Sequence, residues 1–396
     1  MWHDLRGIGA RRKAAWEWSG KPARPSAPRT SPGIPRLHVA EPRSQLLFGY
    51  DAGQIETAAG LPGVLRRKRM NDKGNPTRSR STRVAVVGVG NVGATFAYAL
   101  LLSGLAAEIV LIDANRGKAE GEAMDLNHTV PFTHPTRIWA GEYADCAGAV
   151  VTVLAAGAGQ QPGEARLDLI KKNAAIWREI VPEVATHNPG GILLVATNPV
   201  DVLTYAAWKL SGLPAERVIG SGTVLDTSRF RYQLSQHFGV DARSVHAFII
   251  GEHGDSEVPV WSSANIAGMR LPQFCAAHNI PYDPQVMDEI FHQTRDAAYR
   301  IIERKGATYY AVAAGLMRIT QAILRDQRTV LSVSSLIRDY QGLSDVCLSL
   351  PTVVDRGGIE KVLRLELDPA EIEKLRHSAE ILRRIIKSLE LDGIIN

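Results

Sequence analysis

The clearest hydrophobic pattern in the chain begins near residue 83. An apolar run, RVAVV, leads into the glycine-rich segment GVGNVG, which is followed by the apolar stretch ATFAYALLLSGLA and by a second short run, EIVLID. Short apolar runs bounded by glycine are typical of buried strands, whereas the longer stretch favours a helix. We predict a strand, turn, helix and strand that end at Asp113.

Three further apolar runs follow at similar intervals: AVVTVLAAG from 149, GILLVATN from 191 and RVIGSG from 217. Between the first two, apolar residues recur with helical spacing and predict one buried helix face. This face comprises Ile170, Ala174, Trp177, Val181 and Val184. The alternation predicts an α/β fold with a doubly wound, mostly parallel sheet.

The alternation becomes less regular after residue 222, where we place a domain boundary. Residues 81–222 are expected to form the sheet domain, and residues 223–396 a second, α+β domain. The last segment, DPAEIEKLRHSAEILRRIIKSL, has Asp368 as N-cap, Pro369 at the first helical position and Glu371 two residues later. This order of residues predicts a long final helix.

Residues 1–80 differ from the rest of the chain in pattern and charge. They hold 16 Lys/Arg against 6 Asp/Glu and eight of the 21 prolines, with no sustained apolar period. We interpret them as a disordered basic extension, with Met70 as a candidate start for the folded part. The cluster LRRKRM leaves a nucleic-acid-binding arm as an alternative, although it lacks interleaved aromatic residues.

Composition narrows the class of protein further. With 45% hydrophobic and 22% charged residues, the chain is expected to be a soluble globular protein. Its longest apolar stretches are shorter than the ~20 residues that span a bilayer. The three cysteines, Cys146, Cys275 and Cys347, are far apart and show no CxxC spacing, so we expect no disulfide framework, no metal site and a cytoplasmic location.

The glycine-rich turn has the GxGxxG spacing of a dinucleotide-binding site. Gly88 permits the tight turn, Gly90 lets the backbone approach a pyrophosphate, and Gly93 lets the helix pack on the strand. Asp113 ends the next strand, where a carboxylate accepts hydrogen bonds from an adenosine ribose and repels a 2′-phosphate. We therefore predict a Rossmann domain that binds NAD rather than NADP.

Hydride transfer to a carbonyl also needs a proton donor, a clamp for the substrate and exclusion of water. The segment GEHGDS places His253 between two glycines, and LDTSRFR puts Asp226 and Arg229 on one helical face. An arginine fork matches a carboxylate with two hydrogen bonds. The Gly/Pro-rich loop GQQPGEARLDL leads into a helix, carries Arg166 and has the composition of a closing lid.

These motifs together resemble the L-lactate/malate dehydrogenase family, in particular its bacterial L-lactate dehydrogenases. The resemblance runs from about Thr82 to the C-terminus through GVGNVG, GQQPGEARLDL, ATNPVD, GSGTVLDTSRFR, IIGEHGDS and KGATYY, in the family's order. It implies a reversible, NAD-dependent transfer of hydride between NADH and pyruvate, which gives L-lactate. It does not cover the N-terminal extension.

The resemblance also implies roles for the candidate residues. His253 would exchange a proton with the substrate oxygen, and Asp226 would orient it and stabilise the imidazolium. Arg229 would hold the substrate carboxylate, and Arg166 would polarise the carbonyl as its loop closes.

Other matched positions concern the cofactor and the pocket. Asn198 would lie near the nicotinamide ribose and the substrate oxygen, and Thr308 would line the pocket. Further positions that match cofactor contacts are Val92, Lys118, Tyr143, Gly157, Ala158 and Ser221. Gly159 departs from the family, where Asn or Arg is more frequent, and this loosens the lid hinge without removing a catalytic group.

Two alternatives remain at this point. One is malate dehydrogenase or another L-2-hydroxyacid dehydrogenase; Gln160 argues against malate dehydrogenase, because a second substrate carboxylate favours a cation at that position. The other is an NAD-sensing regulator whose basic tail contacts nucleic acid. A sensor has no need of the complete set of His253, Asp226, Arg166 and Arg229.

Two basic residues point to regulation. Arg231 follows Arg229 by two positions and must face another side of the helix. If the run SVHAFII is mostly extended, His246 lies on the face opposite to His253. Positions that match Arg231 and His246 in the bacterial enzymes bind fructose 1,6-bisphosphate between subunits, so the resemblance implies activation by this effector and a homotetramer.

Overall fold

The computed structural model describes residues 82–159 and 166–395, and the description of side chains resumes at residue 168. The expected basic extension and Gln160 therefore lie outside the described residues. No helix in the described part is long and apolar enough to cross a membrane.

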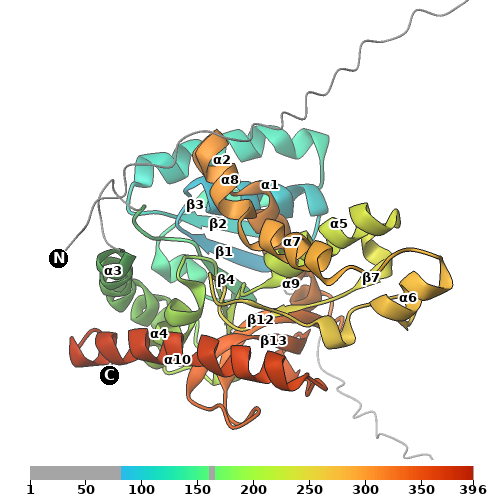
Figure 1. Cartoon of the computed structure of the whole chain (residues 1–396). Helices are drawn as coiled ribbons and strands as arrows, with labels where there is room; N and C mark the ends of the chain where they lie inside the picture. Colours follow the sequence, from blue (N-terminus) through green and yellow to red (C-terminus); the bar gives the residue numbers. More distant parts are fainter. Residues whose placement is uncertain (1–81, 160–165, 396) are drawn as a thin grey trace, which may run out of the picture. The chain divides into compact units, whose positions relative to one another are not determined.

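One nine-stranded sheet organises the structure (Figure 1) in the order β14-β13-β12-β6-β5-β4-β1-β2-β3. Six of its strands are parallel: β1 (Arg83–Val87), β2 (Glu108–Ile112), β3 (Arg137–Ala140), β4 (Val151–Leu154), β5 (Ile192–Val195) and β6 (Val218–Gly220). The order 3-2-1-4-5-6 is that of doubly wound dinucleotide-binding folds, which confirms the predicted fold class.

Helices cover both faces of this sheet. One face carries α1 (Asn91–Ser103), α2 (Arg116–Thr129) and α9 (Tyr310–Leu324). The other carries α3 (Arg166–His187), α4 (Val200–Ser211) and α10 (Pro369–Leu391).

Strand β1 shows why the apolar runs are continuous rather than alternating. Val84 and Val86 pack against the first set of helices, while Ala85 and Val87 pack against the second. A strand buried on both faces needs apolar residues at every position. The predicted stripe on α3 is also confirmed, because all five of its residues are buried in the core that this helix shares with the sheet.

The C-terminal half extends the sheet with antiparallel strands β12 (Thr329–Ile337), β13 (Val346–Asp355) and β14 (Gly358–Val362). Strand β12 pairs with β6 through Ser334 and Gly220. The sheet therefore continues past residue 222, and the domain boundary there remains a prediction.

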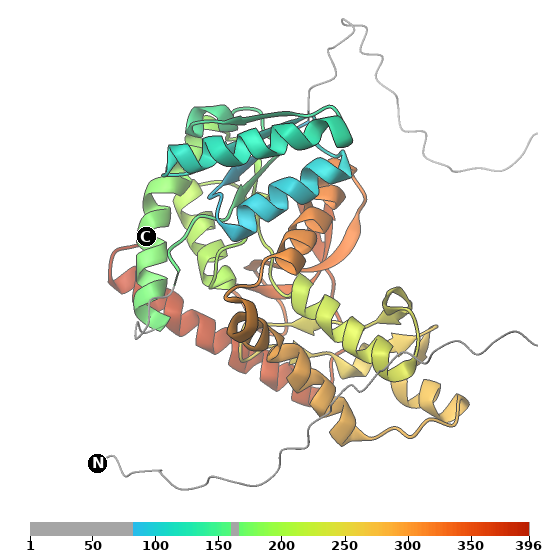
Figure 2. The ribbon, with the colours of Figure 1, turned by 90° about the horizontal axis from the view of Figure 1, so that it is seen from above.

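A separate small core lies around Phe230. The elements that build it are α5 (Val224–Phe238), α6 (Leu271–Ala277), α7 (Pro284–Arg295), β7 (Val245–His246), β8 (Ile249–Ile250), β10 (Asn265–Ile266) and β11 (Met269–Arg270). Two further elements are α8 (Ala297–Lys305) and β9 (Val258–Pro259), whose Val258 packs in the core on the side of α3, α4 and α10. Figure 2 shows α5 and α7 side by side. Helix α5 begins directly after β6, at the carboxyl end of the parallel sheet, so it brings its first turn to the edge where ligands of such sheets bind.

Candidate functional site

The glycine-rich turn joins β1 to α1 at the carboxyl edge of the sheet. Gly88 has φ +95°, and a Cβ atom there would lie 2.3 Å from the backbone nitrogen of Ala156, so only glycine fits. At Gly90 the reverse holds, because no atom lies within 4 Å of a Cβ placed there. The turn is therefore closed on its protein side at Gly88 and open at Gly90.

The N-terminus of α1 has properties suited to an anion. Gly90 provides no side-chain cap, and the first turn of this fully described helix holds no acidic residue. Its free N–H groups and the helix dipole favour negative charge. Asp113 is held beside the turn, since its two carboxylate oxygens accept the N–H groups of Val89 at 2.8 Å and of Asn115 at 2.9 Å.

The other predicted cofactor positions lie mostly at the same edge. Gly157 and Ala158 follow β4, Asn198 follows β5 and Ser221 follows β6. Of the remainder, Val92 is on α1, Lys118 is exposed on α2, and Tyr143 is half-buried in the 3-10 turn Tyr143–Cys146.

Asn173 joins two of these loops and was missed by the sequence reasoning. This buried α3 residue accepts the N–H of Ala158 at 2.8 Å and donates its amide to the carbonyl oxygen of Asn198 at 3.3 Å. It follows the predicted buried stripe residue Ile170 by three positions, so its only sequence signal was a polar residue on an apolar face.

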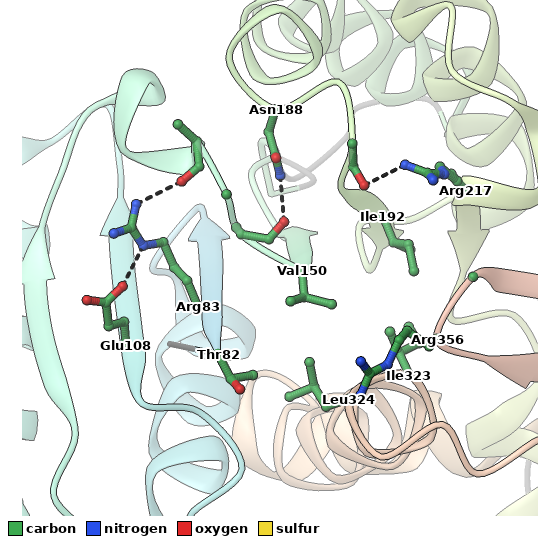
Figure 3. A pocket seen from close by; sticks show the side chains of 15 residues that line it. Thr82, Arg83, Glu108, Val150, Asn188, Ile192, Arg217, Ile323, Leu324 and Arg356 are labelled. Atoms are coloured by element: carbon green, nitrogen blue, oxygen red, sulfur yellow. Dashed lines mark hydrogen bonds and ion pairs between the residues drawn. The ribbon is translucent and has the colours of Figure 1, made fainter. Parts of the chain in front are cut away.

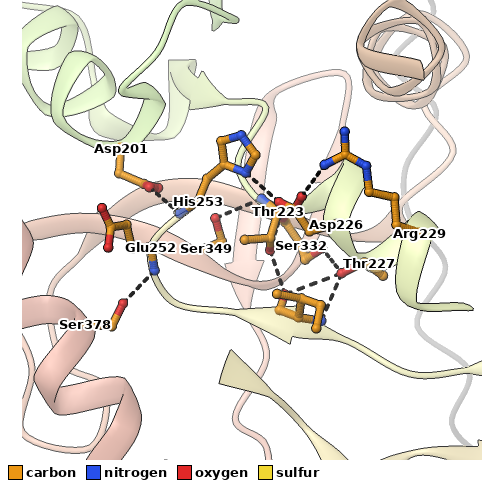
Figure 4. A network of polar contacts seen from close by, with 11 residues as sticks. Asp201, Thr223, Asp226, Thr227, Arg229, Glu252, His253, Ser332, Ser349 and Ser378 are labelled. Atoms are coloured by element: carbon orange, nitrogen blue, oxygen red, sulfur yellow. Dashed lines mark hydrogen bonds and ion pairs between the residues drawn. The ribbon is translucent and has the colours of Figure 1, made fainter. Parts of the chain in front are cut away.

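His253 lies at the centre of a buried polar network (Figure 4). Its Nδ1 is 2.5 Å from Oδ2 of Asp226, and its backbone N–H donates to Oδ2 of Asp201 at 2.7 Å. Asp226 is buried in the first turn of α5. The contact to Nδ1 leaves Nε2 as the ring nitrogen that faces away from Asp226, which is the arrangement of a histidine oriented by a carboxylate.

The start of α5 is anchored by neighbouring hydroxyl groups. Thr223 donates its hydroxyl to the carbonyl oxygen of Ile249 at 2.6 Å, and the hydroxyls of Thr227 and Ser332 are 2.8 Å apart. These bonds join α5 to β8 and β12 and hold Asp226 in position under the histidine.

Charge around the ring decides its protonation. Burial alone lowers the pKa of His253, but the charge of Asp226 and the hydrogen bond to it, together with Asp201 and Glu257, raise this pKa to about 9. In the same pair, burial of Asp226 opposes its ionisation, and the charges of His253 and Arg229 nevertheless lower the pKa of its carboxyl. The pair is therefore an imidazolium and a carboxylate at neutral pH.

Arg229 lies one turn along α5 from Asp226, as its spacing predicts. Its Nη1 donates to Oδ1 of Asp226 at 2.9 Å. Its Nη2 is buried and has no hydrogen-bond partner among the described residues. A buried guanidinium nitrogen without a partner is costly, and a bound carboxylate would satisfy it.

Two further carboxyl groups near the histidine were not predicted. Burial raises the pKa of Asp201 to about 6, which the N–H of His253 only partly offsets. Burial, followed by the charge of Asp226, raises the pKa of Glu257 well above its usual range. Asp201 is the last residue of the motif ATNPVD, and Glu257 directly follows the motif GEHGDS. These positions were the sequence signal from which the two acids could have been predicted.

The remaining candidates for the substrate site are only partly described. Thr308 is half-buried in the loop before α9. Arg166 is the first residue of α3, but its side chain lies outside the described part, and so does Gln160.

Arg231 contacts the two residues that follow His246. Nε of Arg231 donates to the carbonyl oxygen of Ala247 at 2.9 Å, and its guanidinium lies 5.1 Å from the ring centre of Phe248. His246 is exposed at the end of β7. The run SVHAFII holds two strands of different sheets, β7 and β8, with Ala247 and Phe248 between them. That His246 and His253 lie on opposite faces stays a prediction.

Comparison with known proteins gives consistent matches. The lactate/malate dehydrogenase family matches through its NAD binding domain over residues 82–220 and through its α/β C-terminal domain over residues 223–391. The L-lactate dehydrogenase of Acetivibrio thermocellus is 53% identical over 309 residues, which are 78% of this chain and 98% of that protein.

One further relative and one solved structure are also L-lactate dehydrogenases. The L-lactate dehydrogenase of Priestia megaterium is 52% identical over 305 residues, which are 77% of this chain and 96% of that protein. Among solved structures, the minor L-lactate dehydrogenase from Enterococcus mundtii in its ligands-bound form is 41% identical, with a TM-score of 0.76, over 78% of this chain and 99% of that one.

Proposed function

Because the chain belongs to the lactate/malate dehydrogenase family, we propose that it is the NAD-dependent L-lactate dehydrogenase that the sequence predicts. It reduces pyruvate to L-lactate with NADH and catalyses the reverse reaction with NAD. The observation that carries the proposal is the cluster of His253, Asp226 and Arg229, in a chain about half identical to L-lactate dehydrogenases.

The residues present fit NAD. The open space at Gly90 and the uncapped start of α1 suit a pyrophosphate, and the carboxylate of Asp113 suits a ribose diol. Asn198 and Ser221, at the ends of neighbouring strands, are proposed to border the nicotinamide half. When bound, the reduced cofactor supplies the hydride that is transferred to C2 of pyruvate.

His253 supplies the proton that completes the reduction. As imidazolium it donates from Nε2 to the carbonyl oxygen of pyruvate while C2 accepts the hydride, so the carbonyl becomes a hydroxyl and the ring becomes neutral. In lactate oxidation the neutral ring takes this proton back. Asp226 keeps Nδ1 protonated and stabilises the charged form.

Arg229 is proposed to bind the substrate carboxylate. Its Nη2 supports this assignment, because it is buried with no partner in the described part of the chain, while Nη1 is held by Asp226. Arg166 is proposed to polarise the carbonyl, and Thr308 to line the pocket. Support for these two roles comes from the resemblance alone.

The regulatory assignment is also a proposal. Arg231 and His246 are proposed to bind fructose 1,6-bisphosphate in a homotetramer. Its support is that the guanidinium of Arg231 bonds to the residue next to His246. The cytoplasmic location and the domain boundary near residue 222 are proposed on the sequence arguments alone.

The test of the activity is NADH oxidation with pyruvate, oxaloacetate and 2-oxobutyrate side by side. We expect the highest kcat/KM with pyruvate. Gln160→Arg should raise activity on oxaloacetate and lower it on pyruvate by about tenfold or more, because the new cation pairs with the second carboxylate and is unpaired beside a methyl group.

Gln161→Arg is the matched control, since it adds the same charge one residue further along the loop. It should leave the ratio of kcat/KM for the two substrates close to that of the wild type. A wild type that prefers oxaloacetate would contradict the activity, and an unchanged ratio in Gln160→Arg would contradict the role of Gln160.

A further inference from the structure

A cavity of about 880 Å³ lies at the amino ends of the parallel strands (Figure 3). It is lined at the starts of β1, β2 and β5 by Arg83, Glu108 and Ile192, and next to β6 by Arg217. The dehydrogenase site uses the opposite, carboxyl ends of the same strands. This volume falls within the range of small-molecule sites, roughly 300–1,000 Å³.

The apolar part of the lining is aliphatic. Figure 3 shows Val150, Ile192, Ile323 and Leu324 with their side chains around one space. None of the described residues that line this cavity is aromatic. A nucleobase therefore finds no ring to stack on, whereas an alkyl chain finds a matching surface.

The charged groups divide into a corner of paired charges and a positive side. Arg83 binds Glu108 at 2.8 Å and also donates to the carbonyl oxygen of Ala147 at 2.8 Å, so its guanidinium is already held by partners. Nη1 of Arg137 approaches Glu108 at 3.8 Å, and Arg137 is not among the described residues that line the cavity.

Arg217 and Arg356 form the positive side. Arg217 donates one Nη1 hydrogen bond to the carbonyl oxygen of Gly190 at 2.5 Å. Within the described ranges, neither guanidinium forms an ion pair with a carboxylate. Two cations beside an aliphatic surface attract an anion, and its charge would satisfy the guanidinium nitrogens that remain.

We propose that this cavity binds an amphipathic anion, in which a carboxylate or phosphate head group contacts Arg217 and Arg356 and an alkyl chain covers the aliphatic lining. The corner at Arg83 and Glu108 fixes the orientation, because the guanidinium of Arg83 is already paired there, whereas the guanidinium groups of Arg217 and Arg356 form no ion pair within the described ranges. The site is separate from the proposed dehydrogenase site and is independent of that function.

The probes are octanoate and octyl phosphate, titrated calorimetrically into the full chain, with octanol and inorganic phosphate as the two halves of the ligand. We expect both amphipathic probes to bind and to raise the melting temperature, and each half alone to bind about tenfold or more weakly. The probe that binds with the lower Kd identifies the preferred head group as carboxylate or phosphate.

A pair of variants at one position tests the location. A Cβ atom at Gly190 would lie 3.9 Å from Nη1 of Arg217 and within 4 Å of no other atom, so a side chain is accommodated there. Gly190→Glu should pair with Arg217 and weaken both probes by about tenfold, whereas Gly190→Gln, of equal size, should bind them nearly as well as the wild type.

Arg356→Gln should also weaken binding by about tenfold. Arg325→Gln, which removes the same charge next to Leu324 but outside the lining, should not. Absence of binding to the wild type, or equal binding by Gly190→Glu and Gly190→Gln, overturns the proposal. Binding through Arg229 would be unaffected by either Gly190 variant and would likewise overturn it.

Discussion

At the scale of single residues, His253 keeps its proton because carboxyl groups outweigh its burial. The ring lies 2.5 Å from Asp226, and its pKa is about 9, above the ~6.5 of a free histidine. Because this pKa is higher in the folded state, the pair stabilises the fold fully below ~6.5, and this stabilisation is lost as pH rises through 9. The same ionisation of His253 sets the pH range in which the ring can donate a proton to the substrate.

Asp226→Asn should therefore move the pH profile of pyruvate reduction to lower pH. Loss of the carboxylate charge lowers the pKa of His253, so the imidazolium that donates the proton is lost nearer to neutrality. The measurement is kcat for both directions across the pH range. Lactate oxidation, which needs the neutral ring, should begin its rise at lower pH than in the wild type.

Asp339→Asn provides the control, because Asp339 is an exposed partner of Arg364 and belongs to a different network. Its profiles should match the wild type. Identical pH profiles for Asp226→Asn and the wild type would show that Asp226 does not set the ionisation of His253.

At the scale of elements, Glu371 at the start of α10 makes one local contact and two contacts to a distant part of the chain. Glu371 accepts the backbone N–H of Asp368 at 3.0 Å, as the N-terminal pattern predicts. It also accepts the N–H of Ser262 at 3.0 Å and the hydroxyl of Ser262 at 2.6 Å. This buried carboxylate thus ties the start of the last helix to a loop more than a hundred residues earlier in the chain.

Glu371→Ala should lower the free energy of unfolding by roughly 2 kcal/mol, because it leaves partly buried donors without an acceptor. Glu371→Gln, which keeps one oxygen, should cost less. The measurement is denaturant unfolding. Glu380→Ala, at an exposed position of the same helix, should change this free energy by less than about 0.5 kcal/mol, and an equal effect of the alanine variants would refute the role of Glu371.

At the scale of the whole molecule, both halves of the chain build one sheet with two distinct ends. Strand β12 pairs with β6, and α5 leaves β6 toward the carboxyl edge, so the C-terminal half both extends the sheet and carries His253 to it. Arg231 leaves α5 in another direction, toward Ala247 and Phe248. The residues proposed to bind substrate and effector thus share one helix, which would offer a direct route for coupling.

Fructose 1,6-bisphosphate should accordingly lower the KM for pyruvate and favour a tetramer, since a ligand that binds the assembled state stabilises it. KM and the sedimentation profile are measured with and without effector at two pH values. The double variant Arg231→Gln/His246→Gln should lose the response, and a wild type that responds at neither pH would refute the site.

Local sequence patterns determined several helices and strands, and contacts between residues within one helical turn. The apolar runs predicted β1, β2 and the buried face of α3, and the i, i+3 spacing predicted the contact of Asp226 with Arg229. These features depend on periodicity and on residues within one turn, which a sequence displays directly.

Only the tertiary structure decided which distant groups meet. Asp201 binds the backbone of His253, Asn173 joins the loops after β4 and β5, and β12 pairs with β6. Asp201 and His253 are 52 positions apart, and no periodicity links them. Such contacts form because the parallel strands bring their carboxyl ends to one edge, where burial favours hydrogen bonds between polar groups from distant segments. This is a property of the packed chain rather than of any segment.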